Sequence, residues 1–126
     1  MKTTIFICIV LLLNLPLASR AESKIYGIYS NMHHFKGDIS GYEILILHNG
    51  KPGKCSDSVL FQVAESWPQN PELLDCCGCS NSHIEFVSSK WGKFVGHIEN
   101  DTLSGEFVGP HLKINLPKGQ SFWQQY

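Results

Sequence analysis

Residues 75–83 read D-C-C-G-C-S-N-S-H, with three cysteines in four positions and a histidine four residues after the last of them. Together with Cys55, these residues could form two disulfides, bind a metal ion or supply a redox-active pair of thiols. The choice depends on the compartment of the protein and on the elements that hold the cluster.

The N-terminal residues predict export. Lys2 precedes an unbroken apolar run over residues 5–13, and small residues follow at Ser19 and Ala21, which is typical of a signal peptide cleaved after Ala21. The run is shorter than the about 20 residues needed to span a bilayer. We expect residues 1–21 to be a signal peptide and residues 22–126 to be a single domain. The mature protein is then periplasmic or secreted, with no membrane span after cleavage.

The composition limits the classes of partner. The predicted mature chain has 105 residues, which suits one small domain. Cleavage removes Lys2 and Arg20, leaving eight basic and eleven acidic residues, a net charge of −3 with histidine neutral. Because the sequence has no basic stripe, neither nucleic acid nor an anionic membrane is expected as a partner.

Two disulfides are the simplest chemistry for an even number of cysteines in a small exported domain. The cysteines of the predicted mature chain are Cys55, Cys76, Cys77 and Cys79. A bond between the adjacent Cys76 and Cys77 would close a strained ring. We therefore expect Cys55 to pair with Cys76 or Cys77, and Cys79 with the remaining one. A bridge from Cys55 should stabilise the fold by about 3 kcal/mol on the chain-entropy model.

The redox and metal interpretations have less support. Cys76 and Cys79 have the C-x-x-C spacing, but reactive pairs of this kind lie at a helix N-terminus, and here the predicted helix ends at the cluster. Cys76, Cys79 and His83 are ligand types suited to zinc or copper, and they form the alternative metal site. An oxidising compartment favours disulfides over thiolate ligands. No cofactor is expected.

The rest of the chain predicts an all-β fold, because short apolar runs alternate with turn signals. We expect a small antiparallel meander that closes into a 7–8-stranded barrel. Its strands are predicted at residues 25–30, 40–48, 58–64, 84–88, 93–99, 102–108 and 112–116. The Asn49-Gly50 pair is a hairpin signal directly after the second of them.

The best-defined element is a hairpin over residues 93–108. A two-residue turn at Asn100-Asp101 would pair Phe94 with Phe107, Gly96 with Gly105, and Ile98 with Leu103. All six then share one face, and a slip of one residue would turn this apolar set outward. Asn100-Asp101-Thr102 also matches the N-glycosylation sequon, which has meaning only in a eukaryotic secreted protein.

Gly96 and Gly105 leave a gap on the inward face of this hairpin. We expect a strongly curved sheet with an aromatic ring lying over the two glycines. The alternative is that the glycines form the floor of a ligand cavity inside the barrel.

One short helix is expected over residues 71–77. Asn70 suits an N-cap, Pro71 suits the first helical position, and Gly78 suits the left-handed residue after the last turn. A helix of about two turns is not stable alone, so it would have to be fastened to the sheet by a disulfide.

The sequence does not indicate an enzyme. It contains no G-x-S-x-G, P-loop, H-E-x-x-H or dinucleotide-binding motif. His97 and Ser104 are predicted cross-strand neighbours, but no third group is predicted to orient them. A binding function is favoured instead, because aromatic, histidine and methionine side chains lie in predicted loops. The candidate partner-binding residues are Met32, His33, His34, Phe35, Trp67 and Trp91.

The overall plan is a signal peptide followed by a β domain with a cystine-stapled loop. In size and plan it resembles small exported bacterial β-barrels, some of which inhibit hydrolases such as lysozyme or neutralise toxins. The resemblance implies a macromolecular partner, either another protein or a component of the cell envelope. The alternative function is a calycin-like carrier of a small apolar ligand, bound beside Gly96 and Gly105.

Overall fold

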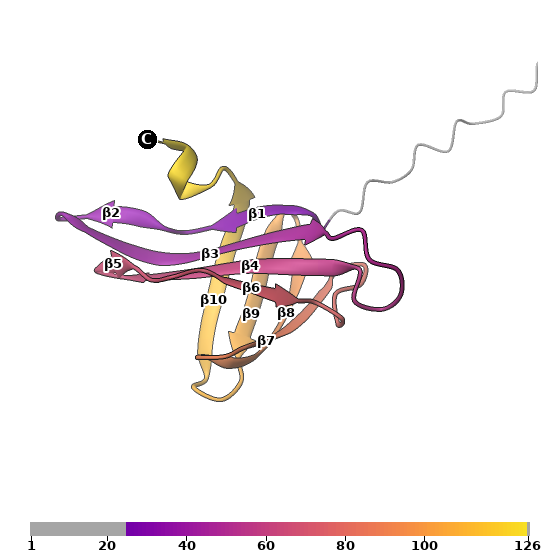
Figure 1. Ribbon diagram of the computed structural model, residues 1–126. Coiled ribbons are helices and arrows are strands. Elements are labelled where there is room, and N and C mark those ends of the chain that lie inside the picture. The colour runs from indigo at the N-terminus through magenta and orange to yellow at the C-terminus, as the bar shows by residue number, and fades with distance from the viewer. Residues whose placement is uncertain (1–24, 126) are drawn as a thin grey trace, which may run out of the picture.

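A computed structural model describes residues 25–125, so the predicted signal peptide lies outside the described residues. One antiparallel sheet curls into a nearly closed barrel, with strand order β5-β4-β3-β1-β10-β9-β8-β7; β2 pairs with β3 and β6 with β4 (Figure 1). The elements are β1 (Gly27–Ser30), β2 (His33–Phe35), β3 (Asp38–His48), β4 (Asp57–Glu65), β5 (Trp67–Pro68), β6 (Glu72–Asp75), β7 (His83–Ser88), β8 (Gly92–Glu99), β9 (Thr102–Phe107), β10 (Leu112–Gly119) and the 3-10 turn η1 (Phe122–Gln125).

The barrel has eight strands, because two pairs of labelled strands continue one another. β1 and β2 pair with β3 in one register, in which Ile28 lies opposite Leu45 and His34 opposite Ile39. β5 and β6 both return antiparallel to β4. The predicted all-β class and antiparallel barrel are therefore confirmed.

The hairpin of β8 and β9 has the predicted register. Phe94 pairs with Phe107, and Gly96 pairs with Gly105. The turn residues Asn100 and Asp101 have φ values of 49° and 57°, as a two-residue turn of this kind requires. All seven predicted strands are present, with bounds that differ from the expected ones by at most three residues.

Aromatic rings fill the barrel interior. The ring centroid of Phe94 lies 4.9 Å from that of Phe86 and 5.1 Å from that of Phe107. The ring of Phe94 also covers both facing glycines: a Cβ on Gly96 would come within 2.9 Å of it, and one on Gly105 would come closer still. The ring of Phe94 therefore fills the barrel interior beside the two glycines, and it is the aromatic ring that was expected to lie over them.

The predicted helix over residues 71–77 is wrong. Residues 72–75 form β6, which pairs with β4 from Ser58↔Asp75 to Phe61↔Glu72. Capping signals are local and contribute about 1 kcal/mol each. The edge of β4 offers this segment a backbone ladder and an apolar surface for Leu74, which packs against the core. Between residues 25 and 125 the only helical element is the 3-10 turn η1.

The turn between β3 and β4 also differs from the prediction. The two strands form an antiparallel hairpin, but His48 pairs with Asp57, and residues 49–56 form the connection. Asn49 organises this longer loop, because its side-chain amide donates a hydrogen bond to the carbonyl oxygen of Cys55 at 2.9 Å.

Side chains close the seam of the barrel, where β6 meets β7. In the described part of the chain no backbone ladder joins these two strands. The Glu72 carboxylate instead accepts hydrogen bonds from the Ser88 hydroxyl (2.5 Å), the Ser89 backbone N–H (2.9 Å) and the Ser89 hydroxyl. At the other end of the seam Gly78 lies against Glu85, where a Cβ on the glycine would be 2.9 Å from the Cβ of Glu85.

The Glu72 seam makes stability depend on pH. Burial alone would raise the pKa of Glu72, but hydrogen bonds from Ser88 and Ser89 hold that pKa below its ordinary value. A carboxyl group of this kind stabilises the fold above its unfolded-state pKa, and the contribution is lost as pH falls through the lowered folded-state pKa.

Glu72→Gln is therefore expected to reduce the free energy of unfolding by about 1.5 kcal/mol at pH 7. The difference from the wild type should shrink as the pH falls below about 4.3, the ordinary pKa of a glutamate, because protons then bind the unfolded wild-type chain more readily than the folded one. Urea unfolding at pH 7 and pH 3 measures both values, with the exposed Glu99→Gln as the control. An equal difference at the two pH values would show that the charge of Glu72 does not hold the seam.

Candidate binding surface

Part of the sheet extends past the barrel and forms an arm, made of residues 33–42 and 63–68, with β2 and β5 at its far end (Figure 1). The turn of its outer hairpin is Lys36-Gly37, with φ values of 50° and 85°. The N–H of Ile39 donates a hydrogen bond to the carbonyl oxygen of Ser66 at 3.0 Å, which ties β3 to the turn between β4 and β5. Since the arm continues the ladder of the barrel, its backbone conformation is well defined.

The outer face of the arm is covered by a second small core. Met32, Ile39, Ala64 and Phe122 are buried together there. The Glu43 carboxylate accepts a hydrogen bond from the N–H of Phe122 at 2.8 Å, which holds the 3-10 turn η1 in place. The 3-10 turn η1, which we call the strap, therefore covers this face of the arm.

The opposite face of the arm carries exposed aromatic side chains. The ring of His34 packs on Phe122 at 5.0 Å, on the outer face, so its neighbour Phe35 lies on the opposite face. Trp67 is paired with Glu65, on the side of β4 that faces the barrel interior. Phe35 is 60% exposed and Trp67 is 74% exposed, so both are open to solvent on one face.

The same end of the barrel opens into a hollow of about 260 Å³, which we call the mouth. Val63 lines it from the inner face of β4, Glu72 from the seam, and Trp91 from the turn between β7 and β8. The ammonium of Lys90 in that turn donates a hydrogen bond to the Oε1 atom of Gln69 at 2.7 Å. This bond ties the turn to the segment that joins β5 to β6, so the mouth lies beside the base of the arm.

The structure brings most of the predicted binding residues to one side of the molecule. Four of the six lie on the exposed face of the arm or at the mouth: His33, Phe35, Trp67 and Trp91. Met32 and His34 alternate with them along the strand and lie on the outer face. Met32 is only 6% exposed, so the expectation that it is an exposed anchor is corrected.

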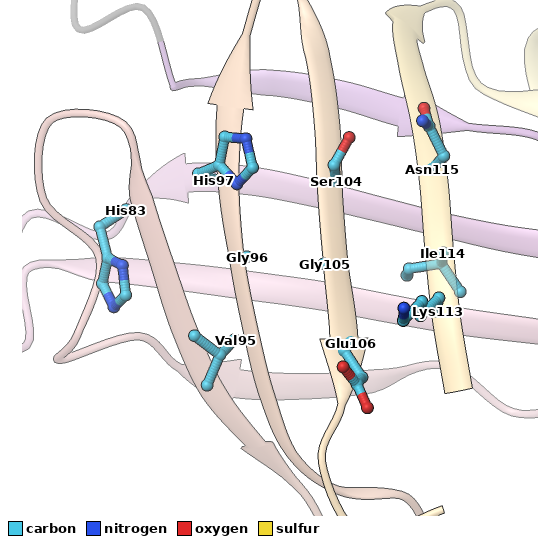
Figure 2. Close-up of a pocket in the computed structure, with 10 residues that line it drawn as sticks. All are labelled: His83, Val95, Gly96, His97, Ser104, Gly105, Glu106, Lys113, Ile114 and Asn115. Atoms are coloured by element: carbon cyan, nitrogen blue, oxygen red, sulfur yellow. The ribbon is translucent and has the colours of Figure 1, made fainter. Parts of the chain in front are cut away.

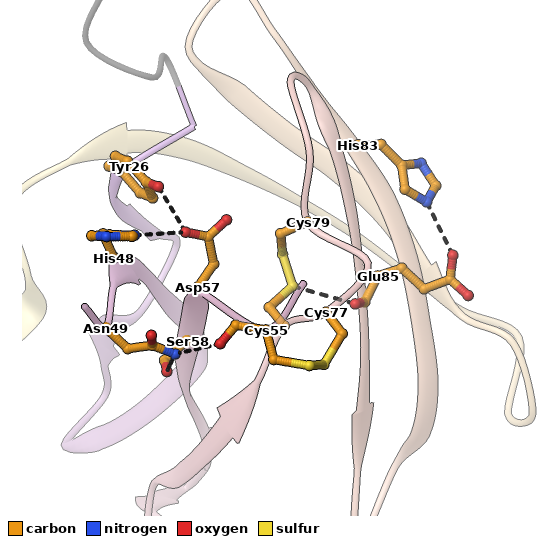
Figure 3. The surroundings of a disulfide bond; sticks show 11 residues. Tyr26, His48, Asn49, Cys55, Asp57, Ser58, Cys77, Cys79, His83 and Glu85 are labelled. Carbon is orange, nitrogen blue, oxygen red and sulfur yellow. Dashed lines mark hydrogen bonds and ion pairs between the residues drawn. A yellow bond between two sulfur atoms is a disulfide. The ribbon is translucent and has the colours of Figure 1, made fainter. Parts of the chain in front are cut away.

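The cysteine cluster forms two disulfides, Cys55–Cys77 and Cys76–Cys79 (Figure 3). This is one of the two expected pairings. The sulfur of Cys76 is buried 3.3 Å from the carbonyl oxygen of Glu85, a contact across the seam to β7. The two bridges therefore fix the end of β6 both to the start of β4 and against β7, and they indicate an oxidising environment.

The alternative metal site at Cys76, Cys79 and His83 does not assemble in this arrangement. The two sulfurs are bonded to each other, and the Nε2 atom of His83 lies 3.0 Å from the Oε2 atom of Glu85. Within residues 25–125, no group of three or more histidine, cysteine or acidic side chains gathers around one point.

A buried carboxylate that the sequence did not indicate lies at the end of the barrel away from the mouth. The hydroxyl of Tyr26 donates a hydrogen bond to Asp57 at 2.7 Å, and His48 Nδ1 lies 3.6 Å from the same oxygen (Figure 3). This hydrogen bond raises the pKa of Tyr26, with burial and the charge of Asp57 adding to the effect. The cluster fastens the chain that enters β1 to the first residue of β4.

A second hollow, of about 560 Å³, lies outside the barrel on β8, β9 and β10 (Figure 2). Gly96 and Gly105 form its floor, so the two glycines do line a hollow, but on the solvent side of the sheet. His97 and Ser104 are cross-strand neighbours on this face, as predicted. The other rim residues include His83, Val95, Glu106, Lys113 and Asn115.

The described part of the chain contains no helix that is long and apolar enough to cross a bilayer. Comparison with known protein families, with curated proteins and with solved structures found no match to this chain. The class is defined by the fold itself, an eight-stranded, nearly closed antiparallel β-barrel with two disulfides.

Proposed function

We propose that the protein is an exported, non-enzymatic β-barrel that binds another protein through the arm and the mouth, as a hydrolase inhibitor or an immunity protein does. One observation carries the proposal. Phe35 and Trp67 are both exposed on one face of a projecting arm, while the opposite face of the arm is packed by the strap.

Exposed aromatic side chains of this size are suited to protein recognition. Tryptophan is enriched among the residues that dominate interface energies, and its burial removes a large apolar area from water. The arm backbone is fixed by the ladder and by its two-residue turn, so little conformational entropy is lost on binding. Phe35 and Trp67 are therefore the expected anchors.

The shape and charge of the surface narrow the kind of partner. A projecting arm fits a concave site such as the cleft of an enzyme, and the mouth beside it can accept a group from the rim of that cleft. Asp38 and Glu65 lie on the same face as the aromatic anchors and are exposed. Basic groups on the partner would complement these carboxylates, and an acidic group would complement Lys36, whose ammonium lies 5.3 Å from the centre of the Phe35 ring.

The calycin-like carrier has less support. A carrier needs a pocket inside the barrel, whereas the hollow of about 560 Å³ over Gly96 and Gly105 lies on the solvent side of the sheet and the mouth has only about 260 Å³. The interior beside Gly96 and Gly105 is filled by the ring of Phe94. Two disulfides together with the predicted signal peptide favour the periplasm or the outside of the cell as the location.

The test is site-specific photo-crosslinking in the cells that produce the protein. A photoreactive phenylalanine analogue replaces Trp67 on the arm or, as the matched control, Leu73 on the outer face of β6. The two positions have similar exposure, 74% and 70%. We expect one discrete protein adduct from position 67 and none from position 73.

A further inference from the structure

Two histidines face each other on the outer face of the barrel. His83 of β7 and His97 of β8 are direct cross-strand partners. The N–H of Ile98 donates a hydrogen bond to the carbonyl oxygen of Ser82 at 2.8 Å. Because this bond joins the residues next to them, His83 and His97 are a non-hydrogen-bonded pair of the antiparallel ladder. In such pairs the side chains approach most closely, with Cβ atoms about 4.5–5.5 Å apart.

Both imidazole rings are accessible from solvent. The side chains of His83 and His97 are 49% and 61% exposed, and both border the outer hollow above Gly96 and Gly105 (Figure 2). The hollow leaves open space beside the rings, because its floor is backbone.

Each ring also has a carboxylate two residues along its own strand. The Nε2 atom of His83 lies 3.0 Å from Glu85, and that of His97 lies 3.8 Å from Glu99. Both contacts lie on the solvent side of the sheet and involve half-exposed imidazoles, where such pairs are weak.

We propose that His83 and His97 form a bidentate site for a divalent transition metal ion, with Cu²⁺ bound most tightly. Metal–nitrogen bonds of about 2.0–2.1 Å require two ligand nitrogens about 3 Å apart. Two imidazoles on facing Cβ atoms reach that separation by rotation about χ1. Imidazole suits copper, nickel and zinc, and Cu²⁺ heads the affinity series of these ions. Water or a carboxylate fills the remaining positions, on the side of the hollow.

Binding requires the rings to turn toward each other. In the structure the ring of His83 is directed toward Glu85 (Figure 3), and the ring of His97 has its Nε2 atom 3.8 Å from Glu99. Exposed ion pairs of this kind are weak, so the carboxylates do not prevent the rotation. The site uses no sulfur atom, and it is therefore distinct from the alternative of Cys76, Cys79 and His83.

The test is titration of the untagged protein with CuCl₂, followed by calorimetry and by electron paramagnetic resonance. We expect one tightly bound Cu²⁺ per chain, with a spectrum that shows two coordinated nitrogens. His83→Gln and His97→Gln should each weaken binding by at least about tenfold. The control is His111→Gln, because His111 lies at the turn between β9 and β10 and contacts Glu106 instead.

All variants concern exposed side chains, and circular dichroism confirms that each one folds. Unchanged Cu²⁺ affinity in His83→Gln and His97→Gln would overturn the proposal, as would a spectrum with a single coordinated nitrogen or the absence of stoichiometric binding. An effect of His111→Gln equal to that of His97→Gln would also overturn it, because binding would then not be specific to the cross-strand pair.

Discussion

Phe94→Ala is expected to lower the free energy of unfolding by about 4 kcal/mol. Phe94 is fully buried, stacks on Phe86 and covers the two facing glycines of β8 and β9. Because Gly96 and Gly105 have no side chains that could move into the vacated space, the substitution leaves a cavity. Such a site cannot collapse, which places the cost toward the upper part of the range for loss of a phenylalanine.

Urea unfolding of Phe94→Ala measures this loss, and Val95→Ala is the matched control. Val95 is the next residue of β8, but it lies on the outer face and is half-buried. Its truncation should cost less than about 1 kcal/mol. Equal losses in the two variants would contradict the register of β8 and β9 and the filled interior that follows from it.

Removal of the Cys55–Cys77 bridge has the second largest expected effect. The cysteines are 22 residues apart in sequence, and they join the residues just before β4 and just after β6. On the chain-entropy model a bridge of this span stabilises the folded state by about 3 kcal/mol. The double variant Cys55→Ala/Cys77→Ala should show this loss in urea unfolding.

The native disulfide state is the reference for that measurement. Intact mass without reductant should show two disulfides in the wild type and one in the double variant. A double variant as stable as the wild type would show that the pairing of β4 with β6 does not depend on the Cys55–Cys77 bridge. The bridge would then have a role other than stability.

The sequence predicted the hairpin of β8 and β9 in full because two independent signals agree there. Phe94, Ile98, Leu103 and Phe107 fall on one face at period-two positions, and Asn100-Asp101 tolerates the positive φ of a two-residue turn. Either signal alone would have left the register open.

The prediction of a helix over residues 71–77 is wrong because only local signals supported it. Asn70, Pro71 and Gly78 are local signals, and they say nothing about the free edge of β4. Nor does the sequence reveal that Glu72 reaches Ser88 and Ser89 across the seam. Gly78 is needed instead for its close approach to β7, which no local pattern indicates.

The candidate surface was predicted by residue type but not by geometry. Exposed aromatic residues were expected around residues 32–35 and at Trp67, and the structure places Phe35 and Trp67 on one face. The arm itself was missed, since β2 is short and fully exposed and therefore has no apolar alternation. Had the Lys36-Gly37 turn been recognised, alternation would have assigned Met32 to the covered face.

The central claim is that the exposed face of the arm binds a protein, and a map of photo-crosslinks tests it most directly. Photoreactive residues are placed at positions 35 and 67 on the arm, and at Leu73 and Val87 on the outer faces of β6 and β7, which are as exposed as the arm positions. The proposed function predicts the same adduct from positions 35 and 67 and none from positions 73 and 87. Adducts of equal yield from all four positions, adducts only from positions 73 and 87, or no adduct at all would contradict it.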